Sequence, residues 1–244
     1  GCVMAARLSE NPGRRVLLIE AGADTPPDAT PPEILDSYPM PLFYGDKYIW
    51  PGLSASFGRL PGGQPVVRTY EQARVMGGGS SINVQSGNRG LPRDYGEWRD
   101  LGANGWGWDD VLPFFKKLES DLDFDGPLHG RDGPIAIRRI ARKDWPQFGK
   151  SVGQAFSQTG LPDIYDQNGE FHDGIFPPAF SNRGDRRVSG AGGYLDASTR
   201  SRPNLTIWAK SKVTGITIEG RRATAVQINR EDVEVTIQGQ RVIV

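Results

Sequence analysis

The sequence predicts an α/β fold that is α+β overall, and three observations carry this prediction. A helix-forming stretch and an apolar run of strand length occupy the first 20 residues. A segment rich in glycine and serine lies around residue 80, and short β-rich runs dominate from residue 205 onward. The 244 residues can bury the core of one large domain or of two small ones.

The first 20 residues predict a helix and a strand. Residues 1–10 are rich in residues that favour a helix, and Asn-Pro-Gly at 11–13 would end it. The run 15–20 has a continuous apolar centre and ends on Glu20, as a buried parallel strand would. In a nucleotide-binding β-α-β unit, an acid about 20 residues beyond the glycine loop binds a ribose hydroxyl. Glu20 fits this role if Gly1 is the last glycine of the loop, and an ordinary α/β crossover is the alternative.

Composition excludes several classes of protein. Lys plus Arg number 29 and Asp plus Glu number 29, so no excess of positive charge favours nucleic acid, and we interpret Arg138-Arg139 and Arg186-Arg187 as solvated surface. A mean hydropathy of −0.47 and the lack of a long apolar run argue against a membrane span. Cys2 is the only cysteine and no signal peptide is visible, so we expect a cytoplasmic protein. No spaced Cys/His cluster indicates a metal site.

The segment 73–83 is the most informative part of the sequence. Three adjacent glycines, Gly77–Gly79, allow the backbone to approach a ligand closely, and the hydroxyls of Ser80 and Ser81 follow directly. Backbone N–H groups beside hydroxyls can cradle a phosphate. Taken alone, the same composition also suits a flexible loop.

This segment resembles the first signature of the glucose-methanol-choline (GMC) family of flavoprotein oxidoreductases. The resemblance extends in order over most of the chain, through residues 1–2, 18–22, 89–95, Trp98, 105–117, 187–189, 194–195 and 202–206. It implies a Rossmann-like FAD-binding domain with an interleaved substrate domain, incomplete here and truncated at both ends. On this basis residues 1–135 are mainly FAD-binding, 136–204 belong mainly to the substrate domain and its connections, and 205–244 return to the FAD domain.

The resemblance also implies the residues that bind FAD. Gly1 and Glu20 would bind the ADP half, and the backbone of Val213 would meet the adenine. The residues lining the pyrophosphate and the flavin would be Val75, Gly77, Gly78, Asn83, Val84, Gln85 and Ser86. Ile82 occupies the position where some members carry a His that is covalently attached to the flavin. Because Ile has no nucleophilic nitrogen, we expect non-covalent FAD.

The activity implied by the resemblance is oxidation of the CH–OH group of a small alcohol to an aldehyde by hydride transfer to flavin. Oxygen or an electron carrier would then accept the electrons. The His that takes the hydroxyl proton, with a second His or an Asn, is expected beyond Val244, so we expect no catalytic residue in this chain and no activity of the chain alone. We interpret His129 and His172, which lie in loop contexts, as structural or surface residues. A lyase that keeps flavin structurally and an inactive cofactor-binding remnant are the alternatives.

The rest of the sequence gives a coarser picture. Residues 26–65 are rich in Pro, Gly and aromatics and predict a long excursion across the cofactor. Residues 109–119 and 144–159 predict helices, the second with a capping box of Asp144 and Gln147 and with Gly160 as its stop. Strands are predicted at 205–209, 213–219, 223–229, 233–238 and 241–244, with turns at 219–221 and 238–240.

Overall fold

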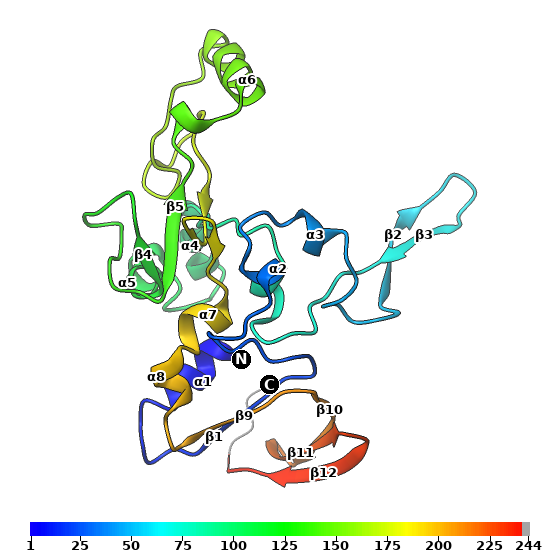
Figure 1. Cartoon of the computed structure of the whole chain (residues 1–244). Coiled ribbons are helices and arrows are strands. Elements are labelled where there is room, and N and C mark those ends of the chain that lie inside the picture. Colours follow the sequence, from blue (N-terminus) through cyan, green and yellow to red (C-terminus); the bar gives the residue numbers. More distant parts are fainter. Residues whose placement is uncertain (241–244) are drawn as a thin grey trace. The chain divides into compact units, whose positions relative to one another are not determined.

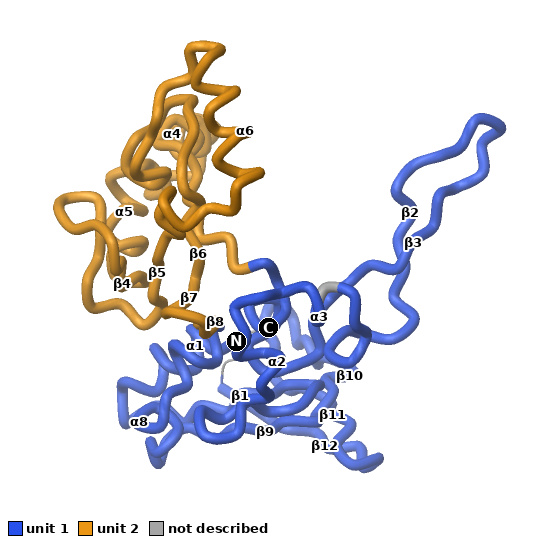
Figure 2. The backbone as a smooth tube through the Cα atoms, turned by 45° about the horizontal axis from the view of Figure 1, so that its top comes forward, with its two compact units in different colours: residues 1–84, 189–244 blue, residues 85–188 orange. Residues whose placement is uncertain are grey.

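The computed structural model describes residues 1–240, apart from the side chain of Phe43. The chain divides into two compact units, which Figure 2 shows in different colours. Unit 1 combines Gly1–Val84 with Ser189–Val244, and unit 2 is formed by Gln85–Val188. Two segments far apart in the sequence therefore build unit 1. The functional assignment of the three predicted segments stays a prediction.

Unit 1 contains the predicted first helix and a parallel strand pair (Figure 1). α1 spans Cys2–Leu8, and β1 (Val16–Ile19) pairs in parallel with β9 (Leu205–Trp208). α1 lies beside α7 (Gly190–Tyr194), where the small side chains of α1 and α7 allow close packing. The helix ends two residues earlier than the sequence suggests, and the residues of β1 are half-buried instead of fully buried. This part confirms a mixed α/β fold.

The chain after β9 forms an antiparallel sheet. Its strands are β10 (Ser211–Glu219), β11 (Arg222–Arg230) and β12 (Val233–Gln238), in that order. Gly220, at φ +61°, forms the turn between β10 and β11, where a left-handed backbone is needed. These strands lie within two residues of the predicted runs. The strand predicted at 241–244 lies outside the described residues.

The predicted long excursion contains more regular structure than its sequence suggests. It includes the short helices α2 (Pro32–Leu35) and α3 (Met40–Phe43) and the hairpin of β2 (Ser54–Arg59) with β3 (Pro65–Thr69). The hairpin is mostly exposed on both faces, so it lacks the alternating apolar pattern that identifies a strand. Residues Ile34, Leu42 and Tyr48 of this region pack with Val75 of the glycine-serine segment in a small hydrophobic core.

Unit 2 is built on a small mixed sheet. β4 (Glu119–Asp121) pairs in parallel with β5 (Ile135–Arg139), which pairs antiparallel with β6 (Ala179–Phe180). β7 (Asn182–Arg183) and β8 (Arg186–Arg187) form a short hairpin. The helices of unit 2 are α4 (Pro92–Asp100), α5 (Trp108–Leu118) and α6 (Gln147–Gln158). The short helix α8 (Ala197–Arg200) belongs to unit 1.

The two helices predicted in this region are confirmed, although one cap is wrong. α6 begins after Pro146, and no side chain caps it; Asp144 instead lies in the short 3₁₀ helix Arg142–Asp144. Proline at 146 displaces the start because it disfavours a helical conformation in the preceding residue, and Trp145 is extended. Gly160, at φ +90°, follows the end of α6 as expected. Among the described residues, none of the helices is long and apolar enough to cross a membrane.

Candidate functional site

The glycine-serine segment has a backbone that requires glycine at its centre. Gly77 and Gly78 have φ values of +91° and +58°, and the 3₁₀ helix η1 (Gly78–Ser81) follows. A Cβ on Gly77 would lie 2.3 Å from the Oγ of Ser81, which is fully buried. A side chain at position 77 is therefore opposed both by the left-handed backbone and by a neighbour that has no room to move.

Ser80 and Ser81 support this backbone. The Oγ of Ser81 donates a hydrogen bond to the carbonyl of Met76 at 2.8 Å. The Oγ of Ser80 donates to the carbonyl of Gly77 at 2.6 Å and accepts from the N–H of Gly190, the first residue of α7, at 2.8 Å. The Ser81 side chain is fully buried, so its hydroxyl supports the backbone of the segment from within.

The end of β1 runs directly beside the glycine-serine segment. Ala23 and Val75 form a parallel bridge, and a Cβ on Gly22 would lie 2.0 Å from the carbonyl oxygen of Arg74. The Oε1 of Glu20 accepts a hydrogen bond from the N–H of Gly22 at 2.7 Å. This contact fixes the Glu20 carboxylate at the carboxyl end of a parallel strand, which is where open α/β sheets bind their ligands.

The start of α1 lies beside β1, close to the strand end that carries Glu20. Gly1 is the N-cap of α1, and a Cβ on it would lie 3.1 Å from the Cδ1 of Leu18 in β1. Burial raises the pKa of the Cys2 thiol, and the negative charge of Glu20 raises it further. Of the ten residues predicted to bind the cofactor, the structure thus brings together Gly1, Glu20, Val75, Gly77 and Gly78.

The other five are more dispersed. Asn83 and Val84 are exposed and end the first segment of unit 1, while Gln85 and Ser86 begin unit 2. Gln85 is buried with a left-handed backbone, φ +65°, and its carbonyl accepts the N–H of Ser181 at 2.8 Å. Val213 lies on β10 opposite Ile228, with 39% of its surface exposed.

Sequence reasoning missed a buried ionic cluster in unit 2. Arg139 is 7% exposed and Arg187 is 4% exposed, so the interpretation of both basic pairs as solvated surface is wrong for these two residues. His129 is also buried, whereas His172 is exposed as expected. A signal was present in β4, because Glu119 and Asp121 alternate with Ser120 and therefore project from one face of a strand.

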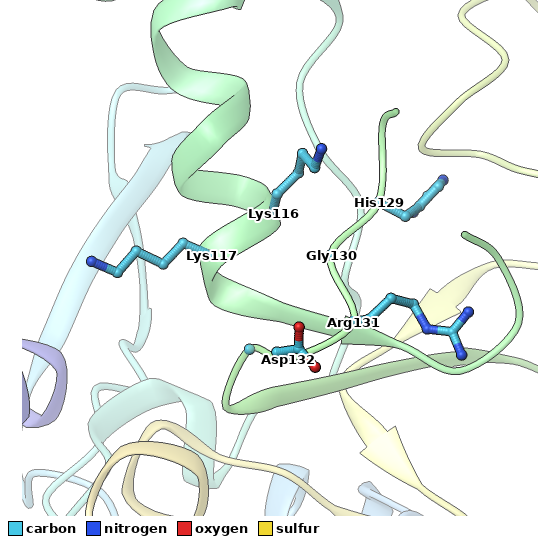
Figure 3. A pocket seen from close by; sticks show the side chains of 7 residues that line it. Lys116, Lys117, His129, Gly130, Arg131 and Asp132 are labelled. Carbon is cyan, nitrogen blue, oxygen red and sulfur yellow. The ribbon is translucent and has the colours of Figure 1, made fainter. Parts of the chain in front are cut away.

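A pocket lies at the end of α5, beside this cluster, and Figure 3 shows its lining. The side chains of Lys116 and Lys117 diverge in Figure 3. Arg131 pairs with exposed Asp125 at 3.3 Å. A Cβ on Gly130 would lie 1.9 Å from the carbonyl oxygen of Lys116, so part of the wall is closely packed backbone. Because no set of polar side chains converges in this pocket, we assign no chemistry to it.

Comparisons with known proteins all point to one family. Residues 54–244 match the family model described as GMC oxidoreductase. The 5-(hydroxymethyl)furfural oxidase of Methylovorus sp. (strain MP688) is 49% identical over 100% of this chain and 46% of that protein. The oxygen-dependent choline dehydrogenase of Brucella anthropi is 35% identical over 100% of this chain and 43% of that protein. The chain thus spans less than half the length of these curated relatives.

Solved structures also match the fold of this chain. The crystal structure of pyridoxine 4-oxidase from Mesorbium loti matches with a TM-score of 0.86 and 30% identity, over 98% of this chain and 45% of that chain. An FAD-dependent oxidoreductase from Chaetomium thermophilum matches with a TM-score of 0.84 and 26% identity, over 98% and 42%. The glycine-lined geometry, the family model and these relatives agree, and the chain belongs to the FAD-dependent GMC oxidoreductase family.

Proposed function

We propose that this chain forms the FAD-binding part of an alcohol oxidoreductase. The observation that carries the proposal is the bare glycine backbone of residues 77–79 beside the start of α1 and the carboxylate of Glu20. A Cβ on Gly78 or Gly79 would meet no atom within 4 Å, so this stretch of backbone borders open space that a flat cofactor could approach. Glycine at such positions serves close approach of backbone to a ligand.

Each of these residues has a definite proposed role. The Glu20 carboxylate accepts hydrogen bonds from ribose hydroxyls, since its Oε1 is already oriented by the N–H of Gly22. Gly1 leaves room for the pyrophosphate at the start of α1, and Gly77 and Gly78 let the backbone lie against the cofactor. Val75, fully buried, holds the segment to the end of β1. Asn83–Ser86 and Val213 complete the proposed set around the flavin and the adenine.

The proposed reaction converts a small primary alcohol to an aldehyde, with oxygen or an electron carrier as the final acceptor. FAD, when bound, supplies a flavin ring that accepts the hydride from the alcohol carbon. The hydroxyl proton goes to a base, and neither histidine of this chain suits that role, because His129 is enclosed by carboxylates and His172 lies in an exposed loop. We therefore place the base in sequence beyond Val244.

We further propose that FAD is held without a covalent bond. Ile82 packs against the core of Ile34, Leu42, Tyr48 and Val75, and its side chain offers no nucleophile. Acid precipitation of the FAD-loaded protein should release the flavin into the supernatant. Flavin that remains in the protein pellet would contradict this proposal.

The first experiment is to add FAD to the purified chain, remove the excess and record the visible spectrum. A retained flavin band supports the proposed site, and a colourless folded protein contradicts it for this chain. Substrate is then tested on the protein of the whole gene by anaerobic bleaching of the flavin band. 5-(Hydroxymethyl)furfural, choline and pyridoxine are the first candidates, because relatives are named for them. A flavin that no alcohol reduces would favour the lyase alternative.

A further inference from the structure

His129 lies at the centre of three carboxylates in unit 2. Its Nδ1 is 3.1 Å from an oxygen of Asp121 and 3.3 Å from an oxygen of Glu119, and its Nε2 is 2.8 Å from an oxygen of Asp166. An ionised carboxylate can only accept hydrogen bonds, so both ring nitrogens must donate. A neutral imidazole has a single N–H, so with the three carboxyls ionised this geometry corresponds to the doubly protonated imidazolium.

The charges of the cluster balance when His129 is protonated. Glu119, Asp121 and Asp166 carry three negative charges. The three cations are Arg139, which binds Asp121 at 2.6 Å and Asp166 at 3.1 Å, Arg89, which pairs with Glu119, and the imidazolium. Asp123 is a further, partly exposed carboxylate at 3.7 Å from Arg139, and the Phe124 ring lies 5.8 Å from the His129 ring.

The electrostatic surroundings of these groups agree with this charge balance. Burial alone lowers the pKa of His129, but its hydrogen bonds to Asp121, Asp166 and Glu119 outweigh burial and raise the pKa to about 11. Burial likewise raises the pKa of each of the three carboxyls, and their bonds to His129 and to the arginines bring each pKa below its ordinary value. Buried charges are tolerated here because each one faces an opposite charge.

The same geometry argues against a metal ion at this cluster. One ligand atom each from Glu119, Asp121 and His129 lie within 4.8 Å of one another, as three metal ligands could. A histidine ligand must present a nitrogen that carries no proton. Here both ring nitrogens face carboxylates, and Arg89 and Arg139 already neutralise two negative charges. The imidazolium is the third cation of the cluster.

A short relay connects His129 to the backbone after the proposed flavin-lining turn. Asp166, which accepts from His129, also accepts the N–H of Asn168 at 3.0 Å. The Oδ1 of Asn168 accepts the N–H of Arg89 at 3.0 Å, and its Nδ2 donates to the carbonyl of Gly87 at 3.1 Å. Asn168 is 1% exposed, so water does not compete for these bonds.

The bonds of Asn168 matter because the residues just before Gly87, Gln85 and Ser86, have a backbone that needs support. Gln85 is a buried non-glycine residue with φ +65°, a conformation that costs about 1–3 kcal/mol and persists only when its surroundings hold it. Its carbonyl is held by the N–H of Ser181. The segment directly after it, Gly87–Arg89, is held by Asn168 and by the Arg89–Glu119 ion pair.

We propose that His129 is a positioning residue of the flavin site. Its imidazolium holds Asp166 and Glu119 in place, and through Asn168 and Arg89 it fixes the backbone of Gly87–Arg89, which directly follows Gln85 and Ser86. The role of Gln85 and Ser86 at the flavin rests on the proposed function, whereas the imidazolium and the relay rest on the contacts within unit 2.

The protonation state is tested first, by NMR of the ¹⁵N-labelled chain with the variant His172→Gln. Because the chain has only two histidines, this exposed-site variant leaves the signals of His129 alone. We expect both ring N–H groups of His129 to persist up to about pH 9, well above the ordinary histidine pKa of about 6.5. A ring that loses a proton near that ordinary value overturns the proposal.

The relay is tested by amide hydrogen exchange at Arg89, whose N–H is donated to the Oδ1 of Asn168. The variants are Asn168→Ala, which removes the relay without touching a charge, and His129→Gln, with His172→Gln as the matched control. We expect exchange at this amide to rise at least about tenfold in Asn168→Ala and His129→Gln, and to stay unchanged in the control. Unchanged exchange in a folded Asn168→Ala overturns the proposal, and this variant decides the question if His129→Gln does not fold.

The flavin arm uses FAD-loaded protein. We expect the visible flavin band of His129→Gln and Asn168→Ala to shift relative to the unsubstituted chain, while His172→Gln leaves it in place. An unshifted band together with faster exchange would overturn the positioning role and leave the proposed function standing. A chain that holds no flavin at all would contradict the proposed function and the flavin half of this inference, while NMR and hydrogen exchange still judge the cluster.

Discussion

The glycine-lined site of unit 1 and the ionic cluster of unit 2 are built on opposite physical principles. At Gly77–Gly79 side chains are absent, the backbone is left-handed at two positions, and Gly78 and Gly79 border open space. Around His129 the side chains are long and charged, every one is close to an opposite charge, and the histidine is 5% exposed. The first region is backbone that borders open space, and the second is a set of buried, paired charges.

This difference explains how each region tolerates change. A glycine backbone is sensitive to added atoms, because a new Cβ meets a neighbour or a disfavoured backbone. A buried ionic cluster is sensitive to removed charge, because the partner that remains is then desolvated and unpaired. Substitutions that add a methyl group in unit 1 and remove a charge in unit 2 therefore test the contrast directly.

The largest effect is expected for Arg139→Met. This change leaves Asp121 and Asp166 without their guanidinium, and loss of one partner of a buried ion pair costs about 3–5 kcal/mol of the free energy of unfolding. Arg131→Met is the matched control, since Arg131 and Asp125 are 59% and 79% exposed and such pairs contribute at most about 1 kcal/mol. Urea unfolding of both variants measures the difference. Equal losses would show that burial does not distinguish the two pairs.

A smaller effect is expected for Gly77→Ala. The added Cβ would occupy a left-handed backbone 2.3 Å from the Ser81 Oγ, and such strain costs about 1–3 kcal/mol. Gly79→Ala, two residues away, is the control, because its φ is not left-handed and its Cβ would meet no atom within 4 Å. Unfolding without FAD should separate the two variants. If Gly79→Ala alone weakens FAD binding, the open space beside it is the cofactor surface.

The pH dependence of stability tests the imidazolium. The folded-state pKa of His129 is raised to about 11 from an unfolded value near 6.5, so its contribution is fully present below about pH 6.5 and is lost as the pH rises towards 11. Over that range the free energy of unfolding should therefore fall as the pH rises. His129→Gln should remove this slope. If the pH slope of the free energy of unfolding survives in His129→Gln, other groups cause it.

The acids of the cluster act at the other end of the pH scale. The pKa values of Glu119, Asp121 and Asp166 are lowered on folding, so their contribution is present above about pH 4 and is lost as the pH falls through the lowered values. Together with His129, these carboxyls place the maximum of stability between about pH 4 and pH 6.5. Chemical unfolding across this range measures the position of that maximum.

The smallest effect is expected for Glu20→Gln. The amide keeps one acceptor for the Gly22 N–H but loses the negative charge offered to the ribose, so FAD affinity should fall about five- to tenfold. Stability without FAD should be nearly unchanged. Glu10→Gln, at an exposed ion pair with Arg7, provides the control. FAD titration by fluorescence measures both, and equal affinities would remove Glu20 from the proposed site.

Sequence reasoning succeeded where the signal is local. The helix at the start, the parallel strand after it, the turn glycine Gly220 and the β-rich end are confirmed, since each depends on a few adjacent residues. The hairpin of β2 and β3 was missed because both of its faces are exposed. The short strands of unit 2 were missed because charged residues interrupt their apolar pattern, as Glu119 and Asp121 do in β4.

The family, the helix and strand order at both ends, and the glycines of residues 77–79 follow from residue type and near neighbours, which a sequence states directly. Three features do not: the inward orientation of the Ser81 hydroxyl, the burial of Arg139 and Arg187, and the contacts of His129 with three carboxylates. Burial and charge pairing depend on contacts between distant segments, which residue type alone does not specify.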